Sequence, residues 1–297
     1  NDSFSLSLIE QTQNFSLIHL YGGGFVNSMW GDYILDVVEF FIDNLNLKNY
    51  VISGQQIEDK IIPRLIKHVA KYQPTFFGVR DYDSLNYLES AGIKAVYSFD
   101  DAYEELNKIA KRIAKDKSNR ILAHFNISSY TGSEDKLNYF SELMQELKTK
   151  NKTAKLTMFN AYDHKRFDVS DTLSVLKFFE DDFIYKCYEL VHGTQYLYDV
   201  LSNIEDYDVL SAKIAISSSY HTTMLMQLSG TPCWLISNNA YYDQKRESLE
   251  VKQTFEEFIE KPFLPSFNNR LDARKDFFKL LNNFINEEIN DSDLIIN

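Results

Sequence analysis

The stretch Ser16-Leu-Ile-His-Leu-Tyr-Gly-Gly-Gly24 sets the pattern of the N-terminal half: a short apolar run of strand-forming residues that ends at glycines. Apolar residues then recur at helical spacing from Asp32 to Asn44, and Asn49 to Ser53 is a second apolar run. The same order continues with a predicted helix at 59–72, strand at 75–79, helix at 84–91 and strand at 94–97. Strands that alternate with helices predict a parallel sheet covered by helices.

The alternation restarts after Lys115–Asn119, a polar stretch that we interpret as a linker. Beyond the linker we predict strands at 120–125, 155–159, 183–188, 212–217 and 233–236. The predicted helices are 101–115 before the linker, and 134–150, 170–180, 194–203, 222–229 and 271–288 after it. We therefore expect two doubly wound, Rossmann-like α/β domains that face a cleft, residues 1–117 and residues 118–297, with the C-terminal helix in the second.

Composition narrows the class of protein. With 297 residues, of which 44% are hydrophobic, the chain can bury a full core, and its net charge of −12 argues against a nucleic-acid binder. No apolar run reaches the length of a membrane-spanning helix, and the N-terminus lacks the pattern of a signal peptide. Cys187 and Cys233 are interpreted as core thiols. We expect a cytoplasmic protein, either free or at the inner face of the membrane, of undetermined oligomeric state.

Two strand ends in the first half are candidate binding loops. Gly22, Gly23 and Gly24 allow backbone N–H groups to approach a ligand closely, although a plain turn is the alternative. Arg80 is able to hold a carboxylate or phosphate with two nitrogens, and Asp81 either orients that arginine or caps the next helix. A structural Arg–Asp pair is the alternative reading here.

The strongest candidate is Ile216-Ser-Ser-Ser-Tyr-His-Thr-Thr-Met224, where a strand ends in serines and a helix begins near His221. A helix N-terminus attracts anions, and a histidine there can exchange a proton near neutral pH. A capped helix with a packed histidine is the alternative. His124 ends the first strand after the linker and is a second candidate. His19 is interpreted as a core or cleft-wall residue, and Asp100 and Asp101 as cleft residues or a helix cap. No histidine pair has metal-ligand spacing, so we expect no metal.

Taken in order, these segments resemble the polysaccharide pyruvyl transferase family. The resemblance rests on Gly22–Gly24, Gly54-Gln55, Val79-Arg-Asp-Tyr-Asp-Ser84 with Gly92, Phe99-Asp-Asp101, Ser217–His221 with Gly230-Thr-Pro232, and Lys245. It implies a fold similar to the GT-B glycosyltransferases. It also implies transfer of the enolpyruvyl group of phosphoenolpyruvate, a co-substrate rather than a cofactor, onto sugar hydroxyls of a glycan or a lipid-linked saccharide.

The resemblance also implies roles for residues. His221 is implied as the catalytic acid. We expect the substrate-binding positions to be Arg80, Asp81, Ser218, Ser219, Tyr220, Gly22, Gly23, Gly24 and Lys245. His124 is added to them because of its place at a strand end. Two departures stand out: Ser219 replaces an arginine of the family, and we expect an N-terminal domain without the family's first strand. There are two alternatives to a pyruvyl transferase. One is a GT-B-type glycosyltransferase that uses a nucleotide sugar, and the other is a binding subunit that has lost the donor site.

Overall fold

The computed structural model describes residues 15–24, 26–28, 31–45, 47–113, 119–124, 142–143, 145–147, 149–151, 154–158, 183–184, 210–237 and 239–289. The chain is an α/β protein with parallel sheets, and it divides into two compact units, Asn1–Tyr103 with Ser266–Asn297, and Glu104–Pro265. The predicted helices at 170–180 and 194–203, and Cys187, lie outside the described residues. Cys233 is buried as predicted.

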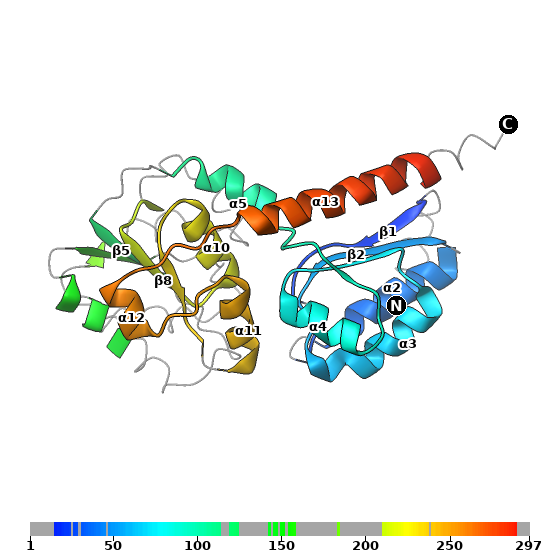
Figure 1. Ribbon diagram of the computed structural model, residues 1–297, viewed down its shortest axis with the longest axis horizontal. Coiled ribbons are helices and arrows are strands. Elements are labelled where there is room, and N and C mark those ends of the chain that lie inside the picture. Colours follow the sequence, from blue (N-terminus) through cyan, green and yellow to red (C-terminus); the bar gives the residue numbers. More distant parts are fainter. Residues whose placement is uncertain are drawn as a thin grey trace, which may run out of the picture. The chain divides into compact units, whose positions relative to one another are not determined.

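The first unit contains a sheet of four parallel strands in chain order: β1 (Leu17–Leu20), β2 (Asn49–Gln55), β3 (Phe76–Val79) and β4 (Val96–Tyr97). The connections are α2 (Tyr33–Leu45), the 3₁₀ turn η1 (Asp59–Ile61) with α3 (Ile62–Tyr72), and α4 (Tyr82–Ser90). Figure 1 shows these helices on one side of β1 and β2, and α13 (Asn268–Phe284) on the other. The strands and helices predicted for this half are confirmed, with ends that move by a few residues.

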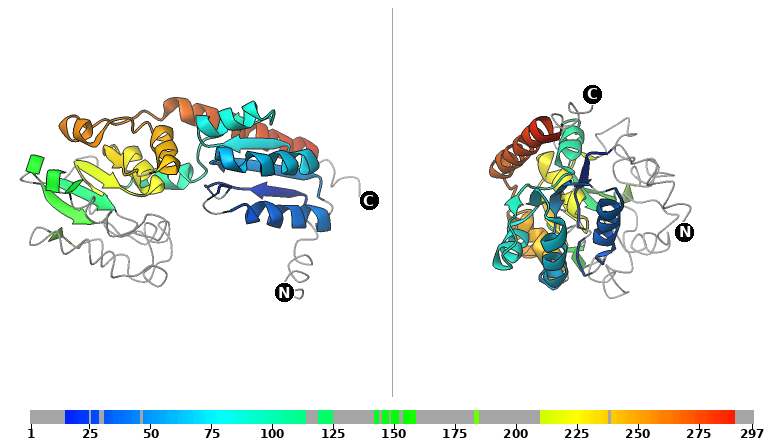
Figure 2. Two further views of the ribbon diagram at one scale, coloured as in Figure 1. Left: turned by 90° about the horizontal axis from the view of Figure 1, so that it is seen from below. Right: turned by 90° about the vertical axis from the view of Figure 1, so that its right-hand side faces the viewer.

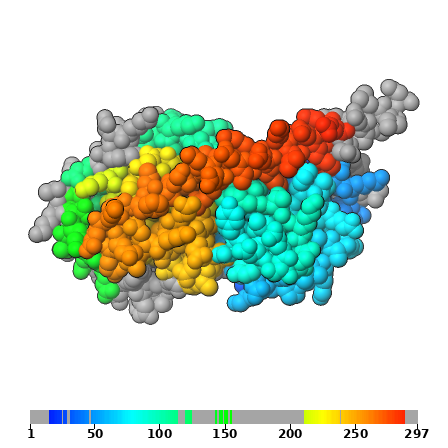
Figure 3. Space-filling view, viewed as in Figure 1, coloured from blue at the N-terminus to red at the C-terminus, as the bar shows by residue number. Residues whose placement is uncertain are grey.

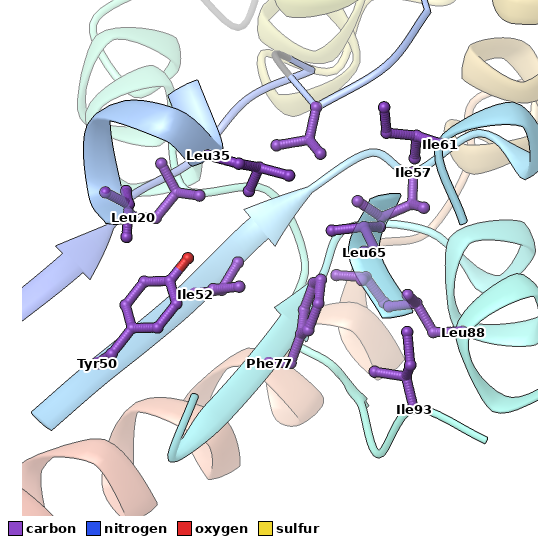
Figure 4. Close-up of a cluster of buried hydrophobic side chains, with 13 residues drawn as sticks. Leu20, Leu35, Tyr50, Ile52, Ile57, Ile61, Leu65, Phe77, Leu88 and Ile93 are labelled. Atoms are coloured by element: carbon purple, nitrogen blue, oxygen red, sulfur yellow. The ribbon is translucent and has the colours of Figure 1, made fainter. Parts of the chain in front are cut away.

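Each face of the first sheet has its own core. Tyr50 and Ile52 point toward the connecting helices and join a cluster with Leu35, Leu65 and Phe77 (Figure 4). Val51 points to the opposite face, as alternation along a strand requires, and packs with the α13 residues Phe277 and Leu281.

Helix α13 corrects the predicted domain division. We expected the C-terminal helix to belong to the second domain, but the ring of Phe277 lies 6.2 Å from that of Phe76 in the first sheet. In Figure 3, α13, orange to red, forms an outer side of the first unit. The physical reason is that β2 and β3 are apolar on both faces, whereas the helices near them in sequence cover only one.

The second unit contains five parallel strands in the order β7-β6-β5-β8-β9. They are β5 (Arg120–His124), β6 (Lys155–Met158), β7 (Phe183–Ile184), β8 (Ile214–Ser217) and β9 (Cys233–Leu235). Because the chain moves outward from β5 first on one side and then on the other, the order reverses between β5 and β8. This doubly wound order was predicted for both domains, whereas the described strands of the first sheet follow chain order. The reversal defines a switch point, where α/β folds bind ligands.

Among the described residues of the second unit, the helices are α5 (Tyr103–Ala110), α10 (Tyr220–Leu228), α11 (Ala240–Ser248) and α12 (Phe255–Glu260), and Figure 2 shows them with the strands. Helices α11 and α12 were not predicted. The signal for α12 was present, because Thr254 and Glu257 form a capping box at its first turn. Across the described parts of the chain, no helix combines the length and apolar character needed to cross a membrane.

Candidate functional site

The switch point of the second sheet brings together the strongest candidates from the sequence. His124 ends β5 and Ser217 ends β8, and the two residues lie side by side in the register of the parallel pair. The backbone N–H of Ser218 donates to the carbonyl oxygen of His124 over 2.9 Å, which extends the pairing by one residue. The serine run and both histidines, His124 and His221, therefore belong to the carboxyl edge of the sheet at the point where the strand order reverses.

The serine run folds on itself and starts helix α10. Ser217 Oγ accepts from the backbone N–H of Ser219 at 2.9 Å and donates to its carbonyl oxygen at 3.2 Å. Ser219 is the N-cap of α10, since its side chain accepts from the N–H of Thr222 at 3.4 Å. The hydroxyl groups of Ser217 and Ser219 therefore hold the helix start in place at the sheet edge.

Helix α10 is buried along most of its length, with one exception in its first turn. All residues from Tyr220 to Gln227 are buried except His221, which is partly exposed. The ring of His221 lies edge-on to that of Tyr220, with 5.3 Å between the centroids. An imidazole held at the start of a buried helix, yet open to solvent, is able to exchange a proton with a ligand at the sheet edge.

Thr222 adds a polar atom that the sequence did not single out. The residue is 1% exposed, and its Oγ1 makes no hydrogen bond to any part of the chain that the structure describes. Buried hydroxyls are nearly always hydrogen-bonded, so this oxygen at the positive end of α10 is a candidate ligand contact. The threonine beside a histidine was a possible signal, but threonine in a first helical turn is too common to be diagnostic.

The end of α10 explains the Gly230-Thr-Pro232 motif. The N–H of Thr231 donates to the carbonyl of Met226 at 2.8 Å, and that of Gly230 to the carbonyl of Gln227 at 3.0 Å. Gly230 has a positive φ of 81°, so the three residues form a Schellman motif that ends the helix and turns the chain into β9. This part of the motif is structural.

Lys245 and Arg246 lie on α11. Lys245 Nζ is 4.0 Å from the ring centroid of Tyr241 and 4.6 Å from that of Tyr242. The guanidinium of Arg246 lies 4.9 Å from the ring of Trp234 and donates to the carbonyl of Gln253 at 2.6 Å. Arg246 therefore has a packing role. The binding role of Lys245 stays a prediction.

In the first unit, Arg80 and Asp81 have separate partners. Arg80 is 2% exposed, and it contacts Asp100 Oδ2 at 3.2 Å and Gln56 Oε1. Asp81 accepts from the N–H of Ser84 at 2.8 Å and caps α4, the second of its two predicted roles. Arg80 thus forms a buried ion pair with Asp100, and this geometry favours the structural reading.

Asp101 is the centre of a polar cluster at the carboxyl edge of the first sheet. Its Oδ2 accepts from Gly22 N at 2.7 Å and from Ser53 Oγ at 2.5 Å, and its Oδ1 accepts from Arg274 at 2.9 Å. Burial raises the pKa of Asp101, an effect that the bonds from Ser53 and Arg274 oppose. The sequence could not reveal the Arg274 contact because 173 positions separate the two residues.

The glycine turn after β1 is fixed by these contacts. Gly22 N also donates to the carbonyl of Ser53 at 3.1 Å, and Gly23 N donates to that of Gly54 at 3.2 Å. Two of the three predicted ligand donors, Gly22 N and Gly23 N, thus have partners within the protein, which favours the reading of Gly22 to Gly24 as a turn.

Comparisons with known proteins show which protein family matches this sequence. The polysaccharide pyruvyl transferase family model matches residues 4–240. No curated protein sequence matches the chain. Among solved structures, it is similar to the crystal structure of accessory secretory protein 1, 2 and 3 from Streptococcus pneumoniae, with 12% sequence identity and a TM-score of 0.49 over 97% of this chain and 57% of that chain. The chain thus spans little more than half the length of that protein.

Proposed function

The chain belongs to the polysaccharide pyruvyl transferase family, and on that premise we propose that it transfers the enolpyruvyl group of phosphoenolpyruvate to a saccharide as a pyruvate ketal. The observation that carries the proposal is the position of His221, a partly exposed imidazole at the start of the buried helix α10, beside the switch point of a doubly wound sheet.

The reaction requires an acid at carbon. His221 in its protonated form gives a proton to the methylene carbon of the enol, which becomes the methyl group. The adjacent carbon becomes electrophilic and bonds to two hydroxyl oxygens in turn, and the C–O bond to phosphate breaks with its electrons on phosphate. Of the two hydroxyl protons released, one balances the proton now on the methyl carbon and the other leaves on phosphate. General acid catalysis of this kind contributes about 10²–10⁴-fold in rate.

The donor is an anion, and the N-terminus of α10 supplies a positive electrostatic end. Thr222 Oγ1, buried and without a hydrogen-bond partner among the described residues, is the neutral donor that we assign to the phosphate or the carboxylate. Ser219 supplies no charge where the family has an arginine. We infer that donor binding here relies on the helix end and on hydrogen bonds from Ser218, Ser219, Tyr220 and Thr222, with His124 at the neighbouring strand end.

The remaining assignments follow from the family. The acceptor is a glycan or a lipid-linked saccharide, handled by a protein in the cytoplasm or at the inner face of the membrane. Neither a metal nor a further cofactor is required by the proton and phosphate steps. We propose a GT-B-like fold, with the donor bound by the second unit.

The replacement of the family arginine by Ser219 favours one second candidate, a glycosyltransferase that uses a nucleotide sugar. The doubly wound sheet with its ligand site at the β5–β8 switch point suits a nucleotide equally well. A binding subunit without activity is the third possibility.

A thermal-shift comparison separates these candidates. We expect phosphoenolpyruvate to raise the Tm of the full chain, and UDP-, GDP- and CMP-sugars to raise it less. Phosphate release in the presence of a saccharide acceptor, lost in His221→Ala but kept in the control His68→Gln, then identifies the transferase. Stabilisation by a nucleotide sugar alone would favour the glycosyltransferase, and binding without turnover would favour the subunit.

A further inference from the structure

A chain of hydrogen bonds at the carboxyl edge of the first sheet begins at a half-buried imidazole. His19 Nε2 lies 2.7 Å from Ser53 Oγ, and Ser53 Oγ donates to Asp101 Oδ2 over 2.5 Å. The side chain of Asp101 is 1% exposed and contacts Arg274 at 2.9 Å through its other oxygen. Neither His19 nor Ser53 takes part in the donor chemistry assigned to the second unit.

The direction of these bonds fixes the tautomer of His19. The Asp101 carboxylate accepts from Arg274, Gly22 N and Ser53, so it has no proton to give to Ser53. The hydroxyl proton of Ser53 is used in the bond to Asp101, and its oxygen must therefore accept from Nε2–H of His19. The imidazole then carries its proton on Nε2, and Nδ1 is the nitrogen with the free lone pair. Burial also lowers the pKa of His19, which keeps the ring neutral near pH 7.

Tyr21 supplies a fixed aromatic surface beside this histidine. Its side chain is 53% exposed, although its hydroxyl donates to the carbonyl oxygen of Asp101 at 2.8 Å. The ring stands edge-on to that of His19, with 5.3 Å between centroids and an interplanar angle of 87°. An exposed tyrosine whose hydroxyl is held keeps one orientation, and its electron-rich face suits the weakly positive C–H face of a sugar ring.

We propose that His19 and Tyr21 form a saccharide-binding subsite on the first unit, in which Tyr21 stacks on a sugar ring and His19 Nδ1 accepts a hydrogen bond from a sugar hydroxyl. Ser53 and Asp101 are the positioning residues, because their hydrogen bonds hold the imidazole in the Nε2–H tautomer.

A saccharide titration without phosphoenolpyruvate tests the subsite alone. The full chain, labelled with ¹⁵N-histidine, is titrated with the methyl glycosides of galactose, glucose and mannose, and its long-range ¹H–¹⁵N spectrum is recorded. The His19 signals, assigned with His19→Gln, should show the Nε2–H tautomer, and Nδ1 should shift with at least one glycoside. Tyr21→Ala should weaken that binding by tenfold or more, whereas Tyr87→Ala, a tyrosine of α4 with 36% exposure, should leave it unchanged. An Nδ1–H tautomer, or no shift with any glycoside, would overturn the proposal.

Ser53→Ala tests the positioning role. The variant removes the oxygen that accepts from Nε2–H, so the His19 signals should no longer show the Nε2–H tautomer alone. An unchanged tautomer in Ser53→Ala would overturn the role assigned to Ser53.

The two proposals fail in different ways. A chain that shows the saccharide shift at His19 but no stabilisation by phosphoenolpyruvate would keep the subsite and reject the transferase. Stabilisation by phosphoenolpyruvate, with phosphate release but no saccharide shift at His19, would reject the subsite and keep the transferase.

Discussion

The carboxylate of Asp101 lies so close to Gly54 that a Cβ atom added at Gly54 would come within 2.6 Å of Asp101 Oδ2. Gly54 also has a positive φ of 61°. Gly54→Ala therefore combines backbone strain of about 1–2 kcal/mol with displacement of a buried carboxylate that holds the glycine turn. We expect a loss of stability clearly above 2 kcal/mol, measured as the free energy of unfolding in urea.

Gly92→Ala is the matched control for this substitution. Gly92 has a φ of 74°, but nothing lies within 4 Å of an added Cβ. This variant should show the strain alone, about 1–2 kcal/mol. Equal losses in the two variants would mean that the contact between Gly54 and Asp101 contributes nothing.

The packing of α13 on the first sheet gives a second prediction. Phe277 is 2% exposed and contacts the Val51 face of the sheet. Phe277→Ala should lower the free energy of unfolding by about 3–5 kcal/mol, as measured by urea denaturation followed by circular dichroism. Leu280→Ala, on the same helix with 53% exposure, should cost less than about 0.5 kcal/mol. A small effect of Phe277→Ala would show that α13 does not stabilise the first unit.

Much of the fold could be predicted from the sequence because short apolar runs and amphipathic segments alternate so regularly. The strands of both sheets follow from local pattern, and so does the start of α10 at the serine run. The place of α13 could not be predicted, since Phe277 packs on Val51 across more than two hundred positions and nothing in the helix itself encodes its partner. Local pattern missed α11 because its sequence is strongly polar and has no clear apolar period.

In the candidate sites too, local sequence pattern predicts some features, and contacts between distant segments determine the others. The Ser217–His221 segment could be placed at a sheet edge because strand end and helix start are adjacent in sequence. The ion pair between Arg80 and Asp100 depends on where β4 ends relative to β3. The burial of Arg80 and the cluster around Asp101 likewise depend on contacts between distant segments, which a single sequence does not show.

Stability of the first unit should fall as the pH falls. His68 bonds to Glu39 Oε1 at 2.7 Å and to Tyr50 OH at 3.2 Å. Burial lowers the pKa of His68, although the nearby Glu39 carboxylate opposes this effect. Arg64 also lowers the pKa of His68, and Asp36 raises it. The folded state thus binds a proton at His68 more weakly than the unfolded state does. Below about pH 6.5, the ordinary pKa of histidine, the unfolded state takes up more protons than the folded state and is stabilised relative to it.

The measurement is the urea midpoint at pH 7.5 and at pH 5.5. The midpoint should fall on acidification in the wild type, and the fall should be smaller in His68→Gln. Part of it should remain, because burial lowers the pKa of His19 as well. An unchanged pH dependence in His68→Gln would assign the effect to other groups.

Ser219 allows the donor site to be tested by restoring charge. Ser219→Arg places a guanidinium where the family has one, and a charge-assisted bond to phosphoenolpyruvate contributes about 1.5–3 kcal/mol, or about 10–100-fold in Kd. The same change removes the N-cap of α10, since Ser219 accepts from Thr222 N, and should cost about 1 kcal/mol of stability.

Ser219→Ala is the matched control, because it loses the cap without adding charge. Isothermal titration with phosphoenolpyruvate should therefore show tighter binding in Ser219→Arg than in Ser219→Ala, although both melt earlier than the wild type. Equal affinity in the two variants would place the donor's anionic groups away from the start of α10.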